Sequence, residues 1–305
     1  MSRTVIYYTI TVLFAGFALY TGKIIIDHGN GYKHEMNTVA KTLNFEERLL
    51  KPKEWLFAKH AWKELNEKYE KIAVRAKDEY EHITKWVIIF TCGCLIYLLT
   101  VLTMYVKTGV FFRKASLSLG FLSFMLLFVG LFCPMLEISA LHNNLHVPIY
   151  IDIPVIGEFD LSRNFEGKMY YFYQNKSIAD VIVLLFQNEN YFVGTCILFF
   201  SIIFPVTKLL FTILSVYSSR WRHNKAISFI VQTLGKWSMA DVMVAACFLA
   251  FLSFANMNAG VDNESDILHG MYFFLGFVIL SLVSSVCLKI HDKRIKANQM
   301  WTLSH

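Results

Sequence analysis

Long apolar stretches recur along this chain, and they constrain its fold more than any other feature. A helix needs about 20 predominantly apolar residues to cross the hydrocarbon core of a bilayer. Stretches of this kind lie at about 4–21, 86–106, 115–136, 191–217, 239–257 and 268–288. With 55% hydrophobic and 17% charged residues among its 305, the chain is too apolar for a soluble domain of this size. The sequence therefore predicts an all-α integral membrane protein with six transmembrane helices.

The first stretch begins directly after Arg3, and it allows two interpretations. It is either a cleaved signal peptide or an uncleaved membrane anchor, and FAGFALYTGK offers no convincing small-x-small cleavage site. We favour the anchor, which gives a first transmembrane helix within residues 1–26 and a second within 84–107.

Charge bias predicts the orientation, because Lys and Arg near the ends of membrane helices are retained on the cytoplasmic side. If the N-terminus is inside, the inner segments carry twelve basic residues and one acidic residue, Asp292, whereas the outer loops at 137–190 and 258–267 are acidic. Both termini, including a tail at 291–305, are then cytoplasmic. The net charge of +6 reflects topology, and we expect no nucleic-acid partner.

Residues 27–83 carry eleven basic and eleven acidic residues and no long apolar run, which indicates a solvated extracytoplasmic segment. Apolar residues from Trp55 to Ile83 recur at spacings of three and four, as in a coiled-coil seam. Pro52 and the HGNG at 28–31 are expected to break the chain on either side of a short helix near 34–50. We predict a helical hairpin that either docks an extracytoplasmic partner or buries its own seam.

A small β-element is expected between the third and fourth apolar stretches, at about 141–177. HVPIYIDIPVIGEFDL alternates apolar and polar residues, and KMYYFYQNKS is typical of a second strand. SIADVIVLLFQ then predicts a short amphipathic helix near the membrane surface.

Two charged residues lie in or beside apolar stretches. Asp241 follows Ser238 at the spacing of a capping box, so one interpretation is that the two residues simply begin a helix. Lys208 lies past the middle of its stretch, where an ionisable group costs about 2.5–3.5 kcal/mol and usually faces a cavity or a partner. Snorkelling of Lys208 toward the cytoplasm explains it without a function; pairing with Asp241 would make both functional.

The surroundings of Lys208 support the second interpretation. Ser201 lies seven residues earlier and returns to the same helix face. Pro205 lacks a backbone N–H and is expected to kink the helix. A second kink is expected at Pro134.

Three segments carry a resemblance to a known family: GLFCPMLEI, SIADVIVLLFQNENYFVGTCILFFSIIFPVTKLLF and LGKWSMADVMVAACFLAF. They are similar to successive landmarks of the paraquat-inducible protein A family, the inner-membrane A subunits of lipophilic envelope-spanning tunnel systems. The resemblance covers about residues 110–290 and implies one tetraspanin-like module of four spans with an outer β-element. It also implies that Ser201, Lys208, Ser238 and Asp241 form an intramembrane polar network, with coupling of lipid movement to proton flow as one option.

The resemblance further implies a bacterial inner-membrane protein that handles phospholipid with a mammalian-cell-entry (MCE) domain partner in the periplasm. Many family members carry two modules and CxxC zinc ribbons, whereas this chain has one module and no CxxC. We therefore expect no metal or other cofactor, and a homodimer or a second subunit if two modules are needed.

Two functions remain open at this stage. The first is a component of a lipid transport system, and the second is a tetraspanin-like scaffold or sensor that assembles an envelope complex without transporting anything. An enzyme is not expected, because no loop gathers a nucleophile, a base and an orienting group.

Overall fold

A computed structural model describes residues 3–52, 55, 58–148, 150–153, 157–160, 162–217, 246, 249, 250, 253 and 262–303. Within these ranges five helical stretches are long and apolar enough to cross a membrane. They are α1 (Arg3–Thr42), α4 (Ala58–Tyr105), α5 (Phe111–Phe132), the succession α7, η1 and α8, and α12 (His269–Leu303). The sixth expected span, 239–257, lies almost wholly outside the described residues.

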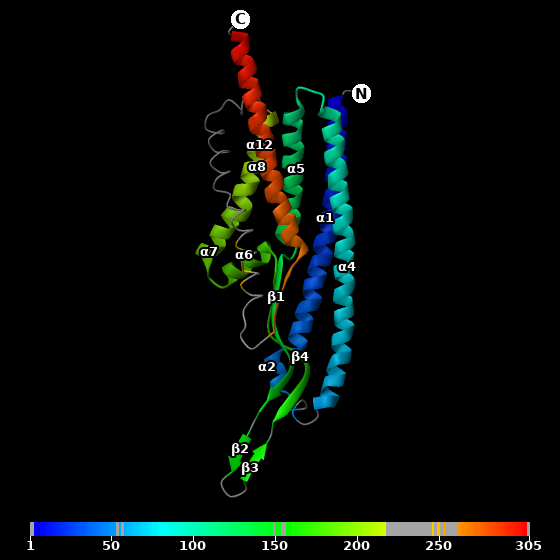
Figure 1. Cartoon of the computed structure of the whole chain (residues 1–305), viewed down its shortest axis with the longest axis vertical. Helices are drawn as coiled ribbons and strands as arrows, with labels where there is room; N and C mark the ends of the chain where they lie inside the picture. Colours follow the sequence, from blue (N-terminus) through cyan, green and yellow to red (C-terminus); the bar gives the residue numbers. More distant parts are fainter. Residues whose placement is uncertain are drawn as a thin grey trace.

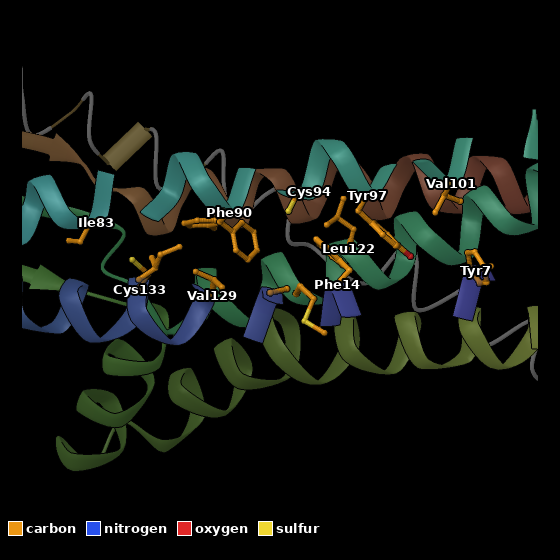
Figure 2. Packing of buried hydrophobic residues seen from close by; sticks show 14 of the residues in the cluster. Tyr7, Phe14, Ile83, Phe90, Cys94, Tyr97, Val101, Leu122, Val129 and Cys133 are labelled. Carbon is orange, nitrogen blue, oxygen red and sulfur yellow. The ribbon is translucent and has the colours of Figure 1, made fainter. Parts of the chain in front are cut away.

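Helices α1 and α4 lie side by side along most of their length and form the elongated edge of the molecule (Figure 1). Phe14 of α1 stacks on Tyr97 of α4, with ring centroids 4.3 Å apart. Leu122 and Val129 of α5 pack against the same cluster, in which Phe90 is fully buried (Figure 2). The first two apolar stretches are thus joined by packing to the rest of the helical bundle.

The break expected at HGNG is wrong, because α1 continues through residues 28–31 to Thr42. Two close approaches use these glycines. A Cβ on Gly29 would lie 3.1 Å from Pro134 Cδ, and one on Gly31 would lie 3.1 Å from the carboxyl carbon of Glu79. Glycine costs about 1 kcal/mol in a helix interior, and here tertiary contacts offset it. The chain breaks only after Thr42, before the short helix α2 (Phe45–Leu49).

The apolar seam of α4 packs on this chain itself. Trp62, Leu65, Tyr69 and Ile72 lie against a buried cluster formed by α1, the segment after it, β1 and β4. Arg48 of α2 is fully buried, lies over the Trp62 ring at 5.1 Å, and donates to the carbonyls of Glu166 and Lys168. Of the two interpretations of the hairpin, the structure favours the one in which it buries its own seam.

A three-stranded antiparallel sheet continues from the end of α5, in the order β4–β1–β5 (Figure 1). It comprises β1 (Leu136–Val147), β4 (Arg163–Lys176) and β5 (Asp262–Ile267), while β2 (Tyr150–Ile153) and β3 (Gly157–Asp160) pair separately. The predicted β-element is confirmed, but it begins at Leu136 and includes a strand from just before α12.

The predicted amphipathic helix is also confirmed as α6 (Ile178–Gln187). Ser177 and Asp180 form a capping box at its start: the Ser177 hydroxyl accepts from the Asp180 N–H, and the Asp180 carboxylate accepts from the Ser177 N–H. Helix α6 leads into the membrane helix that begins with α7 (Tyr191–Leu198), which carries the candidate site.

Candidate functional site

A change of helix type precedes Lys208. Between α7 and α8 (Phe204–Tyr217), residues Phe199–Ile203 form the π-helical turn η1, in which the Phe204 N–H bonds to the Phe199 carbonyl. Pro205 follows directly, and a proline ring crowds the carbonyl four residues earlier, here that of Ser201. The wider turn accommodates this proline. Single π turns inside α-helices occur frequently at functional sites.

Ser201 and Lys208 are both buried, with 1% and 7% of their surfaces exposed. The Lys208 Nζ donates to Ser281 Oγ on α12 at a distance of 3.0 Å. An ammonium has three N–H donors and accepts nothing, so it needs oxygen partners wherever water is scarce. Helix α12 supplies one of them, Ser281, a residue that the sequence pattern did not single out.

The position of Ser281 is fixed by a pair of hydrogen bonds about one turn farther along α12, between Ser284 of α12 and Ser116 of α5. The Ser284 hydroxyl donates to the Ser116 carbonyl at 2.8 Å, and the Ser116 hydroxyl donates to the Ser284 carbonyl at 3.0 Å. Both serines are buried, and a Cβ on Gly120 would lie 3.4 Å from Ser284 Oγ. Small residues let helix backbones approach closely in membranes, and hydroxyls bond across the contact.

The same close contact continues toward the sheet. A Cβ on Gly130 of α5 would lie 2.9 Å from the Phe274 backbone nitrogen, and one on Gly270 would lie 2.4 Å from the Cys133 carbonyl. Pro134 directly follows α5 and its C-cap residue, and its carbonyl accepts from the Gly270 N–H at 3.0 Å. Helices α5 and α12 are therefore in close contact on both sides of the position where Lys208 bonds to α12.

A second buried polar group lies just beyond the membrane helices. Glu137 of β1 is 8% exposed and accepts a hydrogen bond from the Tyr32 hydroxyl of α1 at 2.7 Å. Burial raises the pKa of this carboxyl; the tyrosine hydrogen bonds oppose the rise, and neighbouring Asp266 adds to it. Glu137 thus takes up a proton more readily than an exposed glutamate.

An ion pair joins the N-terminal hairpin to α6. Lys33 Nζ lies 2.6 Å from Asp180 Oδ2, and both side chains are mostly buried. Burial by itself would raise the pKa of Asp180, but the hydrogen bond from Lys33 and those from Ser177 bring it below its ordinary value. One carboxylate therefore caps α6 and also ties it to α1.

The described residues include only two members of the predicted network, Ser201 and Lys208. Ser201 and Lys208 lie on the buried side of one membrane helix. Ser238 and Asp241 lie outside the described residues, so the pairing of Lys208 with Asp241 stays a prediction. The missed serines carry a sequence signal in α5, where Ser116, Gly120 and Ser123 repeat at spacings of four and three.

Within the described residues, no three His, Cys, Asp or Glu side chains gather as a metal site would require. Cys92 is exposed and Cys94 is buried, so the two thiols of TCGC face different directions.

The family model described as Paraquat-inducible protein A matches residues 166–295, from β4 to α12. No curated protein and no solved structure matches the chain. The matched region contains Lys208, Ser281 and the capping box of α6, while α1, α4 and α5 precede it. Taken with the five apolar helices, the match indicates a multi-pass membrane protein. Residues 166–295 of this chain are thus similar to the paraquat-inducible protein A family.

Proposed function

We propose that this protein is the inner-membrane component of a phospholipid transport system and has no enzymatic activity of its own. The observation that carries the proposal is the buried Lys208 of α8, which follows a π turn and donates a hydrogen bond to Ser281 inside the family region. An ionisable side chain inside a membrane domain is expensive and usually marks a transport path or a relay.

The proposed mechanism assigns a role to each part of the site. Phospholipid moves between the membrane helices and an extracytoplasmic tunnel partner of the MCE-domain type, with both termini of this chain in the cytoplasm. Lys208 pairs with Asp241, and protonation of the pair changes during the lipid cycle, because each group's charge sets the proton affinity of the other. The π turn allows the Lys208 segment to shift without breaking its helix. A homodimer would supply the second module that many relatives carry.

The test compares envelope-barrier function and phospholipid distribution in a strain that depends on this protein. Lys208→Met and Asp241→Asn are each expected to abolish function at normal expression levels. Lys107→Met is the matched control, because Lys107 is exposed at the end of α4. Normal barrier function in both site variants would contradict the proposal.

The scaffold function remains the second candidate, and one observation favours it. The N-terminal hairpin lies before the matched region and is tied to it by the Lys33–Asp180 ion pair and the buried Arg48. A rigid attachment of this kind suits an assembly platform. Under this alternative, removing residues 33–83 impairs function more than Lys208→Met does.

A further inference from the structure

A cavity of about 390 Å³ lies where the hairpin meets the sheet, outside the network around Lys208. Met36 and Val39 line it from α1, and Ala73 and Ala76 line it from α4. The two alanines leave space that larger side chains would fill. Its volume lies in the range of small-ligand sites, which are about 300–1,000 Å³.

Two opposite charges also line this cavity, Lys77 from α4 and Asp266 from β5. Neither side chain makes a hydrogen bond or an ion pair within the part of the chain that the structure describes. Asp266 lies opposite Glu137 in the strand register, and Glu264 is close enough to act on the same carboxyl. The sheet side of the cavity is therefore acidic, and the α4 side carries the positive charge.

The cavity lies beside the membrane-proximal part of the hairpin. Tyr32 and Tyr80 are at this end, with ring centroids 5.5 Å apart, and Tyr32 also donates to the buried Glu137. From Tyr32 to Val39, α1 rises about 10 Å, so the site is long enough for a headgroup and the beginning of a chain. Tyrosines of this kind gather where membranes meet water.

We propose that this cavity binds a zwitterionic phospholipid, with the phosphate at Lys77, the ammonium group at Asp266 and the start of one acyl chain along Met36 and Ala73. The inference rests on the proposed function and names its lipid class and a second binding position. A purely anionic headgroup fits less well, because the Asp266 carboxylate lines the cavity and would repel it.

The test uses the full-length protein in nanodiscs that contain phosphatidylethanolamine with a diazirine near the start of one acyl chain. After illumination, labelled peptides are mapped by mass spectrometry. Labelling is expected on residues 32–39 and 69–80. Unlabelled phosphatidylethanolamine should compete about tenfold better than phosphatidylglycerol, the ratio expected for one charge-assisted contact.

Four variants sharpen this test. Ala73→Leu should suppress labelling, whereas Val74→Leu should not, because Val74 is 59% exposed. Lys77→Ala replaces an exposed side chain and should weaken competition about tenfold, and Asp266→Asn should erase the preference over phosphatidylglycerol. Equal labelling of the two leucine variants, or equal competition by both lipids in the wild type, would overturn the inference. Equally good competition by soluble phosphoethanolamine would overturn the assignment to an intact phospholipid.

The failure of this inference can be told apart from that of the proposed function. Lys208→Met should keep the labelling, since Lys208 does not line the cavity. If labelling is absent while Lys208→Met abolishes the barrier, only the cavity assignment fails. If labelling is present while Lys208→Met leaves the barrier intact, the transport role of Lys208 fails instead.

Discussion

Replacing Ser281 by alanine removes the hydroxyl that accepts from the Lys208 ammonium at 3.0 Å. Both side chains are buried, at 4% and 7% exposure, so water cannot readily replace the lost contact. Hydrogen bonds between membrane helices contribute about 0.6 kcal/mol on average and up to about 1.7 kcal/mol. Because this donor is charged, we expect Ser281→Ala to lower the free energy of unfolding by an amount near the upper end of that range.

A double-mutant cycle isolates this contact. In a Lys208→Met background the donor is gone, so Ser281→Ala should change the free energy of unfolding by close to zero. The coupling energy is then about 1–1.7 kcal/mol. Ser285→Ala is the control, because the Ser285 hydroxyl bonds the Ser281 carbonyl within α12 and should behave alike in both backgrounds.

The assay is reversible unfolding of the full-length protein in mixed micelles, followed as the fraction of denaturing detergent rises. Independent sites are additive to within about 0.3–0.5 kcal/mol. A coupling energy inside that limit would refute the claim that α12 holds the Lys208 ammonium. A coupling equal to that of Ser285→Ala would refute it as well.

Three further predictions concern the rest of the molecule. Burial raises the pKa of Glu137 above its ordinary 4.5. Its contribution to folding stability is therefore complete below pH 4.5 and is lost as the pH rises through the folded-state pKa. Glu137→Gln should remove this pH-dependent decline in the melting temperature. The pKa of Asp180 is lowered below 3.8, so its contribution to folding stability is present at neutral pH and is lost in more acidic solution. Asp180→Asn and Lys33→Met should each lower the melting temperature at pH 7. The difference in melting temperature between Asp180→Asn and the wild type should vanish at low pH. Gly130→Ala should destabilise by about 1–3 kcal/mol in detergent unfolding, whereas Gly16→Ala, with open space around its Cα, should be neutral or stabilising.

Local signals predicted the elements that depend on local chemistry. The amphipathic pattern of SIADVIVLLFQ predicted α6. Alternation of apolar and polar residues in HVPIYIDIPVIGEFDL predicted strands where β2 and β3 lie, and KMYYFYQNKS predicted a strand where β4 lies. Apolar length predicted five membrane helices among the described residues. These features need no knowledge of distant contacts.

Features set by tertiary contact were not predictable in this way. HGNG reads as a helix break, yet α1 passes through it because Gly29 and Gly31 sit against α5's end and α4. The strand β5 lies far from β1 in sequence, and its own residues, DNESDI, are not typical of a strand. Polar residues of this kind favour turns when read alone.

The candidate site likewise contains features that the local sequence predicts and features that depend on tertiary contacts. The depth of Lys208 in an apolar stretch and its spacing from Ser201 were visible in the sequence. Its partner Ser281 was not, because serines are common in membrane helices and only the packing of α5 on α12 selects this one. The buried carboxyl of Glu137 was missed because its hydrogen bond comes from Tyr32, a residue more than a hundred positions away, and only the fold brings the two together.

The role proposed for this chain is that of the membrane component of a phospholipid transport system. The most direct measurement is affinity purification of the intact protein in mild detergent, with mass spectrometry of the proteins and lipids that copurify. We expect an MCE-domain partner to copurify, together with phospholipid enriched over the bulk membrane. A different envelope complex that carries only bulk lipid would contradict it and favour a scaffold.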